Sequence, residues 1–122
     1  MKVLAIDYGR RKVGLAISED GLVKPLSVIR YTDIEVLKKK LEKTVSENKI
    51  DKIIVGVSEG FMANESEEFA KNSGAITFDE TLSTYDAQIL SREAGIKRKK
   101  RKKLEDAYAA AVILRNYLDT CF

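Results

Sequence analysis

Three acidic residues stand at points of the chain that could carry chemistry. Asp7 follows a short apolar run, Glu80 follows another, and Asp106 opens an apolar helical stretch. Clustered carboxylates repel one another at neutral pH and need a cation between them. Their oxygens suit Mg²⁺ or Mn²⁺, and two such ions can activate water for phosphodiester hydrolysis. If the fold brings the three acids together, they predict a metal-dependent hydrolase.

The composition narrows the choice of chemistry. The chain has 122 residues, no His and a single Cys, Cys121. The absence of His excludes His-dependent catalytic triads and the usual His-containing zinc sites, and one Cys excludes an intrachain disulfide. A chain of this length fits one domain, expected to cover residues 1–122, with a core that needs no cross-links. Carboxylates therefore remain as the expected metal ligands.

A run of basic residues dominates the net charge of +3. Seven of the 22 Lys and Arg residues are consecutive, and without them 15 basic residues face 19 acidic ones, a net charge of −4. An acidic body with one polycationic segment indicates a polyanionic partner, with nucleic acid the first choice. The alternative is a solvated loop that only aids solubility. This basic block consists of Lys97, Arg98, Lys99, Lys100, Arg101, Lys102 and Lys103.

The sequence contains no evident targeting or membrane segment. The apolar run before Asp7 is only a few residues long, far short of a signal-peptide core or of the about 20 residues that a helical span needs. The single Cys gives no sign of an oxidising compartment. We therefore expect a cytoplasmic protein with no membrane partner.

Hydrophobic patterning predicts the elements that must position the acids. Short apolar runs predict strands at residues 3–6, 13–18, 25–30, 50–57 and 75–78. Apolar residues at helical spacing predict helices at residues 34–45, 65–72, 84–94 and 104–118. The first two strands would form a hairpin, followed by βα units. This order predicts an α/β fold, in which helices cover the faces of a mixed sheet.

This fold allows the acids to converge. If the first and last strands run parallel and lie adjacent, Asp7 and Glu80 project from the same edge of the sheet, and the last helix brings Asp106 over that edge. Each acid also has a purely structural interpretation. Asp7 could form an Asx turn before Gly9, Glu80 could cap the following helix, and Asp106 could complement the dipole of its own helix.

Four segments resemble the YqgF (RuvX) family, in the family's order and over nearly the whole chain. They are an N-terminal motif at residues 7–16 (DYGRRKVGLA), a central strand at 55–57 (VGV), an Asp-Glu-x-x-Ser-Thr motif at 79–84 (DETLST) and a final helix at 105–114 (EDAYAAAVIL). The chain departs from the family pattern at three positions. It has Thr81 for the usual Arg, Ser58 for the usual Pro, and Lys12 for an Arg.

The resemblance implies an RNase H-like fold, with a mixed five-stranded sheet and helices on both faces, akin to Holliday-junction resolvases. It implies a nuclease that matures the 5′ end of pre-16S ribosomal RNA, with Asp7, Glu80 and Asp106 as catalytic ligands of Mg²⁺ or Mn²⁺. The substrate would be structured RNA. The alternatives are a resolvase acting on branched DNA, usually as a homodimer rather than a monomer, and a nucleic-acid-binding protein without catalysis.

Basic residues near the acids are expected to hold the nucleic acid. Thr81 lacks the charge of the family's Arg, and Lys12 lacks the bidentate fork of an Arg. Arg10, Arg11, Lys12 and the basic block are the candidates for contacts with phosphates. The block contains no aromatic residue, so it predicts backbone binding with little base stacking or sequence preference.

Overall fold

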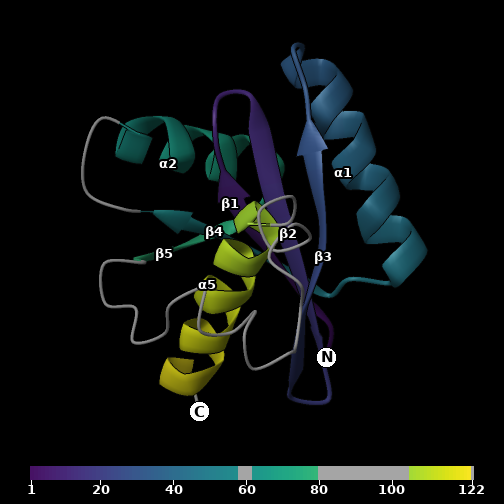
Figure 1. Ribbon diagram of the computed structural model, residues 1–122, viewed down its shortest axis with the longest axis vertical. Helices are drawn as coiled ribbons and strands as arrows, with labels where there is room; N and C mark the ends of the chain where they lie inside the picture. Colours follow the sequence, from purple (N-terminus) through teal and green to yellow (C-terminus); the bar gives the residue numbers. More distant parts are fainter. Residues whose placement is uncertain (58–61, 80–104, 122) are drawn as a thin grey trace.

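The structure is a computed structural model that describes residues 1–57, 62–79 and 105–121. Glu80, the basic block, the predicted helix at 84–94 and the family departures at Ser58 and Thr81 lie outside the described residues. The elements, drawn in Figure 1, are β1 (Val3–Tyr8), β2 (Lys12–Glu19), β3 (Leu22–Arg30), α1 (Ile34–Asn48), β4 (Lys52–Val57), α2 (Met62–Ser73), β5 (Ile76–Asp79) and α5 (Glu105–Cys121).

The five strands form one mixed sheet in the order β3-β2-β1-β4-β5. The β1, β2 and β3 strands pair antiparallel, whereas β4 is parallel to β1 and β5 is parallel to β4. The predicted mixed five-stranded sheet is therefore confirmed. The first and last strands run parallel but are not adjacent, because β4 lies between them. The carboxyl ends of β1, β4 and β5 still share one edge of the sheet.

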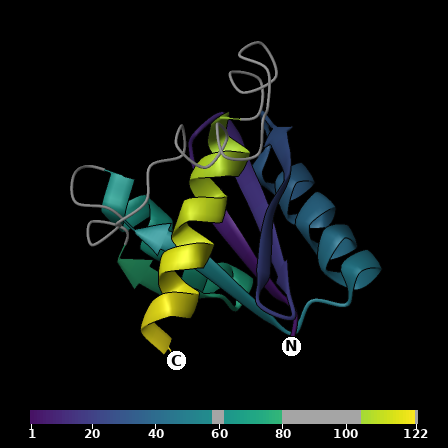
Figure 2. The ribbon, with the colours of Figure 1, turned by 60° about the horizontal axis from the view of Figure 1, so that its bottom comes forward.

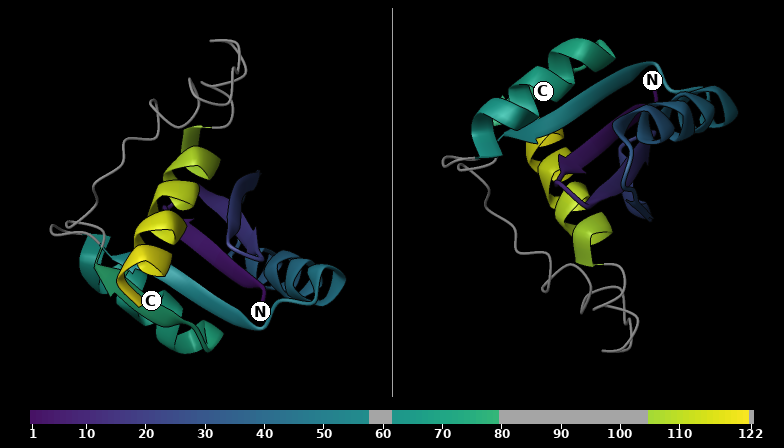
Figure 3. Two further views of the ribbon diagram at one scale, coloured as in Figure 1. Left: turned by 90° about the horizontal axis from the view of Figure 1, so that it is seen from below. Right: turned by 90° about the horizontal axis from the view of Figure 1, so that it is seen from above.

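Side chains that alternate along β1 divide the core into two layers. Val3 and Ala5 pack against α5, whereas Leu4 and Ile6 belong to the cluster that contains residues of α1 and α2. Figure 3 shows the same arrangement, with α5 on one face of the sheet and α1 and α2 on the other. Burial on both faces explains why β1 is an unbroken apolar run rather than an alternating one.

The hairpin between β2 and β3 is longer than the sequence predicted. Its two-residue turn consists of Asp20 and Gly21, with φ angles of 53° and 82°. Such an Asp-Gly turn, with both φ angles positive, matches the right-handed twist of the flanking strands. Pairing therefore begins directly at Glu19 and Leu22, so that β3 starts before Pro25. Pro25 is tolerated because β3 is an edge strand.

The helices differ from prediction mainly at their ends. The α1 helix is capped by Asp33, whose Oδ1 accepts a hydrogen bond from the Glu35 backbone N–H at 2.9 Å. The α5 helix lies across the sheet (Figure 2), and it packs on the sheet with small residues, Ala110 and Ala111, followed by larger ones, Ile113, Leu114 and Tyr117. Within the described ranges, we find no helix long and apolar enough to span a membrane.

Candidate active site

The first predicted acid lies near the carboxyl end of β1. Asp7 is half-buried, and its position in the alternation of Val3 and Ala5 places it on the face that α5 covers. Its cross-strand partner on β2 is Gly14. The acid therefore lies at the edge of the sheet where the parallel strands end, beneath the start of α5.

Gly14 lets the last helix approach the sheet at this point. A Cβ atom built on Gly14 would lie 1.8 Å from the carbonyl oxygen of Asp106 and 2.2 Å from its carbonyl carbon. Only a residue without a side chain fits such a contact between two backbones. Because Asp7 pairs with Gly14 and Gly14 touches the backbone of Asp106, the structure brings two of the three predicted acids to one place.

The carboxylate of Asp106 is paired with a cation. Lys12 Nζ lies 3.0 Å from Asp106 Oδ2, and the two side chains are 46% and 29% exposed. Lys12 is two residues from Gly14 on β2, so both face α5. The ammonium group, predicted as a contact for nucleic acid, here neutralises one of the acids. This corner of the site therefore stabilises a positive charge beside Asp106.

The turn between β1 and β2 is held by Tyr31, which the sequence did not indicate. The Tyr31 hydroxyl donates a hydrogen bond to the Gly9 carbonyl, and its backbone N–H donates to the Arg11 carbonyl at 3.0 Å. Burial, and secondarily the neighbouring Tyr8, raises the pKa of Tyr31. The residue therefore positions the turn that follows Asp7, and only the tertiary structure reveals the contact.

Arg10, another predicted contact for nucleic acid, instead binds an acid of α2. Its Nε and Nη2 donate to the two carboxylate oxygens of Glu65 at 3.1 and 2.7 Å. These hydrogen bonds, together with the charge of Arg10, lower the pKa of Glu65. This bidentate pair ties the β1–β2 turn to α2. Of the three basic residues predicted near Asp7, Arg11 is thus exposed, while Arg10 and Lys12 pair with carboxylates.

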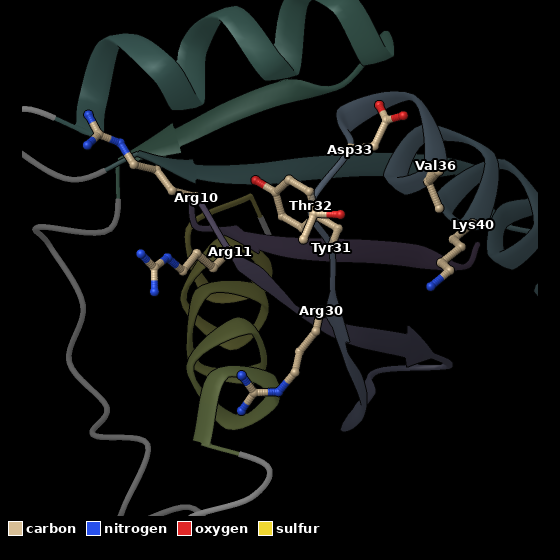
Figure 4. Close-up of a pocket in the computed structure, with 8 residues that line it drawn as sticks. All are labelled: Arg10, Arg11, Arg30, Tyr31, Thr32, Asp33, Val36 and Lys40. Atoms are coloured by element: carbon tan, nitrogen blue, oxygen red, sulfur yellow. The ribbon is translucent and has the colours of Figure 1, made fainter.

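A basic groove extends from the β1–β2 turn towards α1. It has a volume of about 710 Å³ and is bounded by that turn, by the end of β3 and by the first two turns of α1. Figure 4 shows the groove, with Arg11 in the β1–β2 turn, Arg30 directed towards α5 and Lys40 on the side of α1. Arg30 and Lys40 were not predicted from the sequence as site residues, because their proximity depends on tertiary packing.

The third acid and the basic block fall outside the described residues. Glu80 directly follows β5, whose last residue, Asp79, pairs with Val57 at the shared edge of the sheet. Among the residues that the structure describes, no group of three or more His, Cys, Asp or Glu side chains could hold a metal ion. The described part of the candidate site therefore consists of Asp7, Asp106 and the cations around them.

Solved structures with this arrangement of strands and helices define the class of fold. The chain resembles T. thermophilus RuvC in complex with a Holliday junction substrate, with a TM-score of 0.65 and 16% identity over 99% of this chain and 96% of that chain. It also resembles a Fowlpox virus resolvase bound to Holliday junction DNA, with a TM-score of 0.66 and 14% identity over 100% and 99% of the two chains. The fold is thus RuvC-like, within the RNase H-like class, as predicted.

Comparison with sequences identifies the family. The model of a family described as "RuvX: Holliday junction resolvase" matches residues 1–120. A relative from Anaeromyxobacter sp. (strain Fw109-5), named "Putative pre-16S rRNA nuclease", is 35% identical over 98% of this chain and 97% of its own. Relatives with the same name from Agathobacter rectalis and Dictyoglomus turgidum are each 32% identical over 98% of this chain and 95% of their own. The chain belongs to the RuvX family, and its enzyme class is that of a nuclease.

Proposed function

We propose that residues 1–122 form one metal-dependent endonuclease domain that cuts structured RNA during maturation of the 5′ end of pre-16S ribosomal RNA. The observation that carries this proposal is the contact of the Asp106 backbone with Gly14, which is the cross-strand partner of Asp7 at the carboxyl edge of a RuvC-like sheet. The substrate is inferred from the shared name of the relatives.

The residues at this edge fit a divalent cation. Asp7 and Asp106 supply hard oxygen ligands, which are the donors that Mg²⁺ and Mn²⁺ prefer. A positive charge is already stabilised here, since the Lys12 ammonium lies 3.0 Å from the Asp106 carboxylate. We propose Glu80 as the third ligand, because it follows β5, whose carboxyl end lies at the same edge. When bound, the cation would supply an activated water and would stabilise charge on the phosphate.

The cations of the chain would position the substrate. If Asp106 held a divalent ion, the Lys12 ammonium that now pairs with it would be available to contact a phosphate. Arg11 lies in the turn after Asp7 and is exposed, so it contacts the same strand of substrate. Arg10 keeps its bidentate bond with Glu65 and maintains the turn rather than binding RNA. The basic block would add contacts that are sensitive to salt.

A second candidate is the resolution of Holliday junctions. The description of the family model and the likeness in fold to RuvC favour it. A resolvase must cut two strands of one junction, which requires two active sites and hence a homodimer. An RNA nuclease that cuts one strand needs only a monomer. Sedimentation of the protein with and without a four-way DNA junction therefore separates the two candidates.

A cleavage assay tests the proposed function. Wild type and the variants Asp7→Asn and Asp106→Asn are incubated with Mg²⁺ or Mn²⁺ and either an RNA spanning the 5′ end of pre-16S rRNA or a four-way DNA junction. Each variant should lose more than about 100-fold in rate, since even indirect support of a metal site is worth 10–100-fold. Asp119→Asn is the matched control, because Asp119 is exposed near the other end of α5.

Four outcomes would be decisive. Cleavage of the RNA by wild type and Asp119→Asn, but not by the Asp7 and Asp106 variants, supports the proposal. If only the junction is cleaved, the second candidate, a Holliday-junction resolvase with the same carboxylate mechanism, is supported instead. If wild type binds but cuts neither substrate, a binding protein without catalysis is favoured. If Asp7→Asn cuts as fast as wild type, the carboxylate mechanism is wrong.

A further inference from the structure

The groove between the β1–β2 turn and α1 collects basic side chains from three elements. Arg11 comes from the β1–β2 turn, Arg30 ends β3, and Lys40 lies two helical turns into α1. These three side chains are exposed, and a single acid, Asp33, lines the groove with them. Asp33 Oδ1 accepts the N–H of Glu35 as the helix cap. The groove therefore carries an excess of positive charge.

The shape of the groove suits a chain of phosphates more than a single small anion. Its volume is about 710 Å³, far more than one phosphate group requires. Asp33, Val36 and Lys40 are spaced three and four residues apart, so they form one face of α1 along the length of the groove. Arg11, in the β1–β2 turn, and Arg30, whose side chain is directed towards α5 in Figure 4, line the groove from the side of the sheet. Guanidinium groups present a planar fork that matches the geometry of a phosphate.

Strand pairing connects the groove to the acids. Arg30 is the cross-strand partner of Lys12, whose ammonium pairs with Asp106. Directly opposed residues of antiparallel strands have Cα atoms about 4.5–5.5 Å apart and side chains on the same face. Arg30 therefore connects the face that carries Lys12 and Asp106 with the groove that it lines, and Lys40 lines the same groove from α1.

We propose that this groove binds the phosphodiester backbone of the nucleic acid next to the cleavage site, with Arg30 and Arg11 holding the nearest phosphate and Lys40 a more distant one. The proposal rests on the nuclease function and adds a path for the substrate. From the acids, the nucleic acid would cross the end of β3 towards α1. Arg30 and Lys40 become binding residues, and Arg10, held by Glu65, does not.

Binding can be measured without cleavage in the Asp7→Asn background. The probes are a fluorescein-labelled RNA hairpin with a single-stranded 5′ extension and a labelled four-way DNA junction, followed by fluorescence anisotropy over a series of NaCl concentrations. The test variant is Arg30→Gln/Lys40→Gln. The control is Lys24→Gln/Lys39→Gln, which removes the same charge from exposed positions of β3 and α1 that do not line the groove.

Two lost phosphate contacts should make the slope of log K against log[NaCl] less steep by about 1.5, since each contact contributes about 0.7–0.9. At 0.15 M salt, this corresponds to about tenfold weaker binding. The control should leave the slope unchanged. If the groove variant loses affinity for the RNA alone, RNA is the occupant of the groove. If it loses affinity for the junction alone, the occupant is branched DNA. Circular dichroism spectra establish that both double variants are folded.

The outcomes separate this proposal from the proposed function. If wild type cleaves and the two double variants bind alike, the groove proposal is overturned and the nuclease stands. If the groove variant loses affinity and salt slope while wild type cleaves nothing, the nuclease is overturned and the groove stands. If the Asp7→Asn protein and wild type both fail to bind either probe, both proposals are overturned.

Discussion

Replacement of Gly14 by Ala tests the contact on which the candidate site depends. The added Cβ would lie 1.8 Å from the carbonyl oxygen of Asp106, whereas real Cβ atoms essentially never approach within 3.0 Å. The start of α5 must then retreat from β2 by at least 1.2 Å, since both sides of the contact are backbone. Overpacking of this kind costs about 1–3 kcal/mol. For a domain of this size, we expect the melting temperature to fall by about 4–12 °C.

The same displacement should impair function more than stability. It moves Asp106 away from Asp7, and a misplacement of about 1 Å in a catalytic constellation can cost about 100-fold in rate. Thermal unfolding followed by circular dichroism, with and without Mn²⁺, measures both effects. Wild type should be stabilised by Mn²⁺, and Gly14→Ala should lose most of that stabilisation together with its cleavage activity.

The control for a general loss of stability is Leu41→Ala. Leu41 is buried in the layer under α1, on the opposite face of the sheet, and its truncation should cost about 2–5 kcal/mol. The Leu41→Ala variant should nevertheless keep the rise in melting temperature that Mn²⁺ causes in wild type. A Gly14→Ala protein with the melting temperature and Mn²⁺ response of wild type would refute the packing argument. An equal loss of the Mn²⁺ response in Leu41→Ala would refute the link to the site.

Three further substitutions test contacts of the β1–β2 turn and the cap of α1. The raised pKa of Tyr31 means that the folded protein keeps this phenol protonated above its ordinary pKa of 10, where the unfolded chain loses the proton. Its contribution to stability is thus present below pH 10 and is lost as the pH rises. The free energy of unfolding, measured by urea denaturation, should therefore fall less steeply above pH 10 in Tyr31→Phe than in wild type. Glu65→Gln should release Arg10 and steepen the salt dependence of RNA binding by about 0.7; an unchanged slope in anisotropy titrations would mean that Arg10 stays out of reach of the RNA. Lys49 caps α1 with a left-handed φ of 53°, so Lys49→Gly should raise the free energy of unfolding by about 0.5–1 kcal/mol, and a loss of stability in urea titrations would contradict this assignment of the cap.

The local elements were predictable because each depends on neighbours in the sequence. The apolar run of β1 is buried on both faces, as such a run implies. The helix after Thr32 was expected from apolar residues at helical spacing, and Asp33 provides its cap. The start of β3 was predicted too late, because Pro25 was taken as its first residue. The Asp20-Gly21 turn instead sets the start of pairing at Leu22.

Contacts between distant segments could not be predicted in the same way. Arg10 and Glu65 are 55 residues apart, and nothing in either local sequence indicates that they pair. Arg30 lies opposite Lys12 only because β2 and β3 pair in one register, which a shift of one residue would change. The position of β4 between β1 and β5 likewise follows from how the βα units pack, and the sequence alone did not predict it.

The sequence by itself determined the kinds of groups that this protein can use. Without His, and with one Cys, it restricts the expected metal ligands to carboxylates, and its motifs identify the RuvX family. Only the tertiary structure decided which groups meet. The missing side chain of Gly14 lets two backbones touch, and this contact places Asp106 beside Asp7. Residue types are a property of the chain, whereas proximity depends on packing between segments nearly one hundred residues apart.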